Sequence, residues 1–232
     1  MSEPKTKTGL AIVAGAGEGL GRHLMTRFQA GGYTTVGLVR TMPDRATADA
    51  GLIRLDLADA AATAVVIGDL VSRHGAPAVV IHNTAELVIS PFAGLSAAEF
   101  ESCWRNTALS AMNLAKAVLP DMVEAGGGAF LVSGATASIR GGARFAAFAA
   151  AKFALRGLTQ SLAREYQSQG VHVAHVLLDG IIDTPRSRDL HDMDPALMMR
   201  PTEIAEAYWG LAHQPRSTWT HEMDLRPLTG NF

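Results

Sequence analysis

Short apolar runs alternate along this chain with longer stretches in which apolar residues recur at helical spacing. The short runs predict strands, because strands buried on both faces of a parallel sheet are almost wholly apolar. They cover residues 9–14, 33–39, 51–55, 77–81, 129–133 and 171–178, with a possible edge strand at 218–225.

The stretches between these runs predict helices, since their apolar residues return every three or four positions. These helices cover residues 20–30, 59–74, 96–103, 104–124, 146–169 and 202–212. For the second, the expected apolar face is Ala62, Val65, Val66, Leu70 and Val71. Strands that alternate with helices fold as a mostly parallel sheet covered by helices on both faces.

The sequence therefore predicts an α/β fold with a doubly wound parallel sheet of the Rossmann type. No linker, repeat or low-complexity segment divides it, so we expect a single domain over residues 1–232. Residues 181–200 are less regular and contain Pro185 and Pro195. This segment is either a mobile flap over a site or a plain surface loop.

Composition narrows the class of protein. Lys and Arg total 20 against 22 Asp and Glu, a formal net charge of −2, which argues against nucleic acid as a partner. No run approaches the ~18 apolar residues of a membrane helix, and Met1–Thr8 is polar, unlike a signal peptide. The single cysteine, Cys103, excludes an internal disulfide and fits a reducing compartment. We expect a cytoplasmic protein without a metal site.

A glycine-rich turn joins the first strand to the first helix, which is the context that a nucleotide-binding loop requires. Glycines let the backbone approach a pyrophosphate, and the helix N-terminus offers free N–H groups and the positive end of its dipole. The residues expected at the cofactor in this turn are Gly15, Gly17, Glu18, Gly19, Leu20 and Gly21.

The end of the second strand bears on the choice between NADP and NAD. A carboxylate here would hold the ribose 2′-hydroxyl, whereas an arginine suits a 2′-phosphate. Val39 cannot act as the carboxylate, and Arg40 follows it directly. Glu18 counts against a 2′-phosphate if its side chain points that way. We expect NADP(H) to be favoured over NAD(H).

Taken in order, these motifs resemble the short-chain dehydrogenase/reductase family over about residues 9–212. That family's TGxxxGxG loop matches residues 14–21, and its NNAG stretch corresponds to residues 82–85 with only Asn83 retained. Its PGxxxT stretch matches residues 179–184, with aspartate in place of proline. The single positions that match the family's aspartate near the adenine, its structural asparagine and the lysine of YxxxK are Asp56, Asn106 and Lys152.

The resemblance implies where the cofactor contacts lie. Asp56 would meet the adenine, Asn83 and Lys152 the nicotinamide-side ribose, and Thr184 the carboxamide or pyrophosphate. The further cofactor contacts that it implies are Leu57, Thr84 and Gly180. Family members pair their long helices, so the resemblance also implies a homodimer or homotetramer.

The catalytic positions depart from the family pattern. In the family a tyrosine handles the substrate proton, the lysine lowers its pKa and a serine binds the same oxygen. Here the tyrosine position holds Phe148, which has no ionisable proton, and the serine position holds Ala135. The expected catalytic residues and the hydroxyls that a loop shift could bring in are Lys152, Asn106 and Ser138, with Ser133 and Thr136 nearby. The expected substrate pocket, suited to an apolar ligand, is Ala135, Phe145, Phe148 and Asp179.

Three interpretations stay open. The protein is an oxidoreductase on a small organic substrate that needs no phenolic proton, such as a pre-formed iminium ion, or one that uses another acid. The candidate acids are His82, Glu86, Asp179 and His175. Alternatively it binds NADP(H) with little turnover, as a redox sensor or partner subunit. In the third, the motifs only shape the fold, and Lys152 is a surface lysine.

Overall fold

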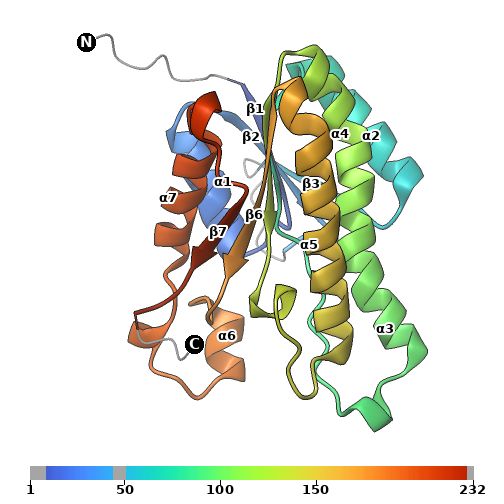
Figure 1. Ribbon diagram of the computed structural model, residues 1–232, viewed down its shortest axis with the longest axis vertical. Helices are drawn as coiled ribbons and strands as arrows, with labels where there is room; N and C mark the ends of the chain where they lie inside the picture. The colour runs from blue at the N-terminus through green and yellow to red at the C-terminus, as the bar shows by residue number, and fades with distance from the viewer. Residues whose placement is uncertain (1–8, 44–50, 229–232) are drawn as a thin grey trace.

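The computed structural model describes residues 9–43 and 51–228 and contains a seven-stranded sheet with helices on both faces (Figure 1). The strands are β1 Leu10–Ala14, β2 Thr34–Val39, β3 Leu52–Arg54, β4 Pro77–His82, β5 Gly128–Ser133, β6 Val171–Leu178 and β7 Glu222–Leu225. Their order is β3-β2-β1-β4-β5-β6-β7, and every neighbouring pair is parallel. The predicted doubly wound parallel sheet is confirmed, and its order reverses between β1 and β4.

The helices form two layers, one on each face of the sheet (Figure 1). They are α1 Leu20–Ala30, α2 Ala60–His74, α3 Ala97–Trp104, α4 Ser110–Glu124, α5 Ala146–Tyr166, α6 Pro185–Leu190 and α7 Pro201–Ala212. Helices α2, α4 and α5 cover one face, and α1 and α7 cover the other. Each face of the sheet has its own hydrophobic core: the first lies under α2, α4 and α5, and the second lies under α1 and α7. Along β1, Leu10 and Ile12 belong to the first core, and Ala11 and Val13 belong to the second. Burial on both faces is the reason that the strands read as continuous apolar runs.

The helices predicted at 96–103 and 104–124 are one continuous helical run. A capping box begins it, because Ser96 and Glu99 exchange hydrogen bonds between side chain and backbone. A π-helical turn, Arg105–Leu109, then joins α3 to α4. Such turns often occur at functional sites, and this one contains Asn106.

Two other predictions differ in detail. The helix predicted to reach residue 169 ends as α5 at Tyr166 and continues as a 3-10 turn, Gln167–Gln169. The predicted apolar face of α2 is wrong at Val65, which is 72% exposed, because the helix turns Thr63 and Ile67 inward instead. The possible tail strand is confirmed as β7, parallel to β6.

The irregular segment 181–200 is a loop whose two ends lie side by side. The Met199 N–H donates to the Ile181 carbonyl at 2.8 Å, and the Asp183 N–H donates to the Met199 carbonyl at 2.9 Å. Between these bonds, Thr184 caps the short helix α6 through the Ser187 N–H. The loop is therefore pinned at its base, beside the end of β6. Within residues 9–43 and 51–228, no helix is long and apolar enough to cross a membrane.

The core between α4 and the sheet gives a prediction about stability. Leu114 of α4 is fully buried in the first core. Leu114→Ala should lower the free energy of unfolding by about 2–5 kcal/mol, because it removes buried methyl groups and leaves a cavity. Val65→Ala on the exposed side of α2 should change it by less than about 0.5 kcal/mol. Urea unfolding measures both, and equal losses would contradict the described packing.

Candidate functional site

A groove of about 480 Å³ runs along the carboxyl ends of β1, β2 and β4. This is the edge at which open parallel sheets bind ligands, next to the point where the strand order reverses. The groove brings together most of the cofactor residues expected from the sequence and others that were not expected. Those in its wall are Gly15, Gly17, Arg40, Asp56, Leu57, Asn83, Thr84 and Asn106, with Ser110 and Arg186 among the unexpected ones.

The glycine loop has both structural and open positions. Gly15 has a φ of +81°, and a Cβ there would lie 2.6 Å from the Asn83 carbonyl oxygen. A Cβ at Gly21 would overlap the Gly15 carbonyl oxygen, so both glycines are needed to form the loop itself. A Cβ at Gly17 would meet no atom within 4 Å. Gly17 thus faces open space at a helix N-terminus, which fits a dinucleotide pyrophosphate.

The segment after β6 also touches this loop. The Thr184 methyl carbon would lie 3.3 Å from a Cβ at Gly19, so Thr184 and the glycine turn are neighbours as expected. Glu18 is exposed at the tip of the turn. The Leu20 side chain is buried in the second core, so its cofactor contact stays a prediction that only its backbone could meet. Gly180 is explained by packing, since a Cβ there would lie 2.8 Å from Pro227.

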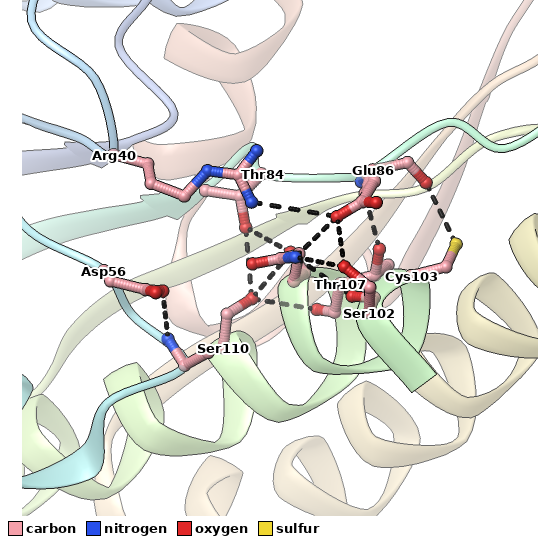
Figure 2. A network of polar contacts seen from close by, with 10 residues as sticks. Arg40, Asp56, Thr84, Glu86, Ser102, Cys103, Thr107 and Ser110 are labelled. Atoms are coloured by element: carbon pink, nitrogen blue, oxygen red, sulfur yellow. Dashed lines mark hydrogen bonds and ion pairs between the residues drawn. The ribbon is translucent and has the colours of Figure 1, made fainter. Parts of the chain in front are cut away.

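Arg40 belongs to a polar network beside the groove (Figure 2). Its Nη1 atom lies 3.7 Å from Oε2 of Glu86, and the same oxygen accepts hydrogen bonds from Asn106 Nδ2 at 2.5 Å and Ser102 Oγ at 2.9 Å. The Asp56 carboxylate accepts from the Ala58 N–H at 2.9 Å. Glu86 was expected only as a possible acid, and the structure instead makes it the ionic partner of Arg40.

The π-helical turn frees the Asn106 carbonyl for side-chain donors. Thr84 Oγ1 donates to it at 3.1 Å and Ser110 Oγ at 3.0 Å. Both hydroxyls also contact Nε2 of His82, at 2.8 and 2.9 Å. Burial, with a smaller contribution from the Lys152 charge, lowers the pKa of His82 to about 3. His82 is therefore a neutral core residue near pH 7, which argues against it as the substituting acid.

Lys152 is buried, so its interpretation as a surface lysine is wrong. From the first turns of α5 its Nζ atom donates to the Ser133 carbonyl at 2.8 Å, where β5 ends. Burial lowers the pKa of Lys152 to about 8. His175 on β6 is buried too, and mainly burial, then the Lys152 charge, lowers its pKa to about 4. Like His82, His175 is a neutral core side chain near pH 7.

The nearby hydroxyls have different surroundings. Ser138 is fully buried, and its Oγ accepts from the Ala135 N–H at 3.1 Å, so it holds the turn after β5. Its assignment as a catalytic residue stays a prediction. Ser133 Oγ points to the second core and is hydrogen-bonded to the Tyr208 hydroxyl at 2.7 Å. Thr136 donates its hydroxyl to the Asp179 carboxylate.

Asp179 is the centre of a second polar cluster, at the ends of β5, β6 and β7. Besides Thr136, it lies 3.5 Å from Nε of Arg226, which follows β7. Ala135, at the position of the family serine, directly precedes Thr136. The structure thus brings a carboxylate, a hydroxyl and a guanidinium together beside the position where the family places its serine.

Aromatic side chains from the start of α5 lie beside these polar groups. Phe145 and Phe148 are partly buried, and Phe148 packs against Cys103, Ala147 and Ala151. The Phe148 ring centroid lies 5.7 Å from the Lys152 Nζ atom. Cys103 is fully buried, as expected, and burial raises the pKa of its thiol to about 11.

The sequence interpretation missed three residues that the structure brings to these sites. Arg186 reaches the groove from α6, in the segment with no regular pattern. Ser110 is the first residue of α4, and Arg226 directly follows β7. Each reaches its site through contacts between distant parts of the chain, so no local motif marks it.

Comparison with known proteins agrees with this geometry. The chain is 27% identical over 189 residues to the 3-oxoacyl-(acyl-carrier-protein) reductase FabG of Salmonella typhimurium, covering 79% of this chain and 77% of that protein. A crystal structure of a short-chain dehydrogenase from Rhodopseudomonas palustris superposes with a TM-score of 0.78 and 29% identity, over 97% of this chain and 100% of that one.

A second solved structure is more distant in sequence. It is an NAD(P)-dependent protein assigned as a gluconate 5-dehydrogenase, from Beutenbergia cavernae, with bound NADP at low occupancy. Its TM-score is 0.83 at 22% identity, over 94% of this chain and 95% of that one, which indicates a shared fold. The family model described as short chain dehydrogenase matches residues 9–195. Because this match covers most of the sequence, the chain belongs to the short chain dehydrogenase family of NAD(P)-binding oxidoreductases.

Proposed function

We propose that the protein is an NADP(H)-dependent oxidoreductase acting on a small organic substrate, with an altered proton-transfer site. The observation that carries the proposal is the groove at the carboxyl edge of the sheet, where the open glycine loop and Arg40 face the same space. NADP(H), when bound, would supply or accept the hydride. The NADP in the Beutenbergia cavernae structure belongs to that protein and is in line with this choice.

The groove residues suit the parts of such a cofactor. Backbone N–H groups around Gly17 would hold the pyrophosphate, and Arg40 would bind the 2′-phosphate with its planar guanidinium. Asp56 and Asn83 line the groove, where they would meet the adenine and the nicotinamide-side ribose. Lys152, at the end of β5, would contact the same ribose. Arg186 in the groove wall offers a second guanidinium for the phosphates.

The altered site needs a replacement for the phenolic proton. By its spacing from Lys152, Phe148 would hold the position of the family tyrosine, and Ala135 would hold that of the serine. Thr136 and Asp179 are already hydrogen-bonded beside Ala135. In the oxidative direction, a substrate hydroxyl would give its proton to Thr136 Oγ1 as Thr136 passes its own proton to Asp179. Reduction would run the same transfers backwards.

Arg226 has a defined part in this route. Its guanidinium lies 3.5 Å from Asp179 Oδ2 and would hold the carboxylate in place beside Thr136. A silent NADP(H)-binding protein would need the glycine loop and Lys152 as well, but it would have no need of a proton acceptor. The Thr136–Asp179 pair therefore supports the enzymatic alternative.

We also propose that the chain assembles as a homodimer or homotetramer in the cytoplasm. Phe100 and Trp104 of α3 and Phe153 of α5 leave large apolar side chains partly exposed. Helices α3 and α5 pack against each other, so these residues lie on neighbouring elements. An apolar surface of this kind supports association through the helical layer that contains α4 and α5.

Gly17 provides the first test. Gly17→Ala should weaken both NADPH and NADH by about 10- to 100-fold, because the new methyl group would fill the space for the pyrophosphate. Its folding should be unchanged, since no protein atom lies within 4 Å. Fluorescence titration measures the affinities. Gly68→Ala in α2, which also enters open space, is the control and should leave both affinities as they are.

Arg40 tests the choice of cofactor. Arg40→Gln should weaken NADPH about tenfold or more and leave NADH unchanged, because only NADPH carries the phosphate that the guanidinium would bind. Arg105→Gln is a matched control, since this exposed arginine pairs with Glu101 on its own helix. If Arg40→Gln weakened both cofactors equally, the assignment of the 2′-phosphate to Arg40 would be wrong.

Thr136 and Asp179 test the proton route. A panel of carbonyls, imines and alcohols first identifies a substrate through NADPH oxidation or NADP⁺ reduction. Thr136→Val and Asp179→Asn should then lower kcat by about 10²–10⁴-fold without changing NADPH affinity. Phe148→Tyr should raise carbonyl reduction. Asp224→Asn, which removes the exposed partner of Arg226, is the control. Full activity of the Thr136 and Asp179 variants would exclude this route.

A further inference from the structure

The ion pair between Arg40 and Glu86 lies beside the groove that we assign to the cofactor (Figure 2). Three polar groups converge on a single carboxylate oxygen, Oε2 of Glu86. They are Arg40 Nη1 at 3.7 Å, Ser102 Oγ at 2.9 Å and Asn106 Nδ2 at 2.5 Å. A charged side chain that the sequence assigns to a cofactor phosphate is thus already paired with a carboxylate of the protein.

The two members of this pair are held very differently. Glu86 is 28% exposed and keeps the hydrogen bonds from Ser102 and Asn106 whether or not Arg40 is present. Its backbone is held as well, because Cys103 Sγ donates to the Glu86 carbonyl at 3.0 Å. Arg40 is 60% exposed at the end of a flexible side chain. If the pair opens, Arg40 is the member that moves.

A 2′-phosphate is a stronger partner for Arg40 than Glu86 is. A phosphate monoester carries about two negative charges and three acceptor oxygens, whereas Glu86 offers one charge. An exposed ion pair contributes only a factor of about two to five to an equilibrium constant. Arg40 can therefore leave Glu86 for a phosphate, but the loss of the ion pair reduces the net gain in affinity.

We propose that Glu86 competes with the cofactor 2′-phosphate for Arg40 and so weakens the selectivity of the protein for NADP(H) over NAD(H). This inference rests on the proposed function. NAD(H) has no phosphate at this position and leaves the Arg40–Glu86 pair intact. Glu86 therefore acts on the affinity for one cofactor only, and it determines specificity without contacting the reacting atoms.

Glu86→Gln is the variant that tests this competition. All three side-chain contacts of Glu86 use Oε2, so a glutamine whose amide oxygen takes that place keeps both hydrogen bonds and loses only the charge. NADPH should bind about two- to fivefold more tightly to this variant, and NADH should bind as before. Titration of the full chain with each reduced cofactor, followed by its fluorescence, gives the four affinities.

Two further variants separate competition from other effects of the charge. In an Arg40→Gln background, Glu86→Gln should no longer change NADPH affinity, because no guanidinium is left to compete for. Glu101→Gln removes a carboxylate that faces the neighbouring hollow, also lined by Arg40, and that pairs with Arg105 at 3.8 Å. It should leave both affinities unchanged.

Other results would overturn the inference. An equal loss for both cofactors would make Glu86 a structural support of Asn106, and a selective loss for NADPH would mean that Glu86 orients Arg40 for the phosphate. Tighter NADPH binding that persists without Arg40 would show simple repulsion. Failure of the proposed function itself looks different: the unmodified protein binds neither cofactor, or Arg40→Gln leaves NADPH affinity unchanged.

Discussion

The close approach of two backbone segments at the end of β1 is the constraint on which the rest of the site depends. Gly21 sits against the Gly15 carbonyl, and Gly15 sits against Asn83, at distances that no side chain would permit. The Asn83 N–H donates to the Ala14 carbonyl at 2.9 Å, and its side-chain amide donates to the Gly15 carbonyl at 3.3 Å. These contacts hold β1, α1 and the end of β4 together where the strand order reverses, and the groove follows from them.

Two charged side chains make the difference between a nucleotide-binding edge and a potential active site. Lys152 is buried with its ammonium group on the Ser133 carbonyl, which brings α5 to the end of β5. Arg40 lines the groove and is 60% exposed. Burial lowers the pKa of Lys152, whereas solvent screens the charge of Arg40. The exposed Arg40 is therefore the one of the two that can exchange partners.

The region proposed as the substrate half of the site combines an apolar surface with a polar cluster. Phe148 and its neighbours form an apolar surface next to Lys152, and the Thr136–Asp179–Arg226 cluster follows β5, β6 and β7. Aspartate replaces the family proline at Asp179, so this position exchanges a rigid residue for a charged one. Phe148 lies in the first turn of α5 and Asp179 directly follows β6, so the two positions come from different elements.

Sequence alone predicted the succession of strands and helices along the chain, the parallel sheet, the glycine loop and a role for Lys152. It could do so because apolar runs, helical spacing and a glycine-rich turn are local patterns. It failed where a side chain could face either of two directions. Ser133 and Ser138 are both close to Ala135 in sequence, yet one bonds Tyr208 in the second core and the other closes a turn. Glu86 and Arg226 gained their partners, and Arg186 its place in the groove wall, only when distant segments came together at one edge of the sheet. Which face a side chain takes, and which charge it meets, depends on long-range packing that no local pattern records.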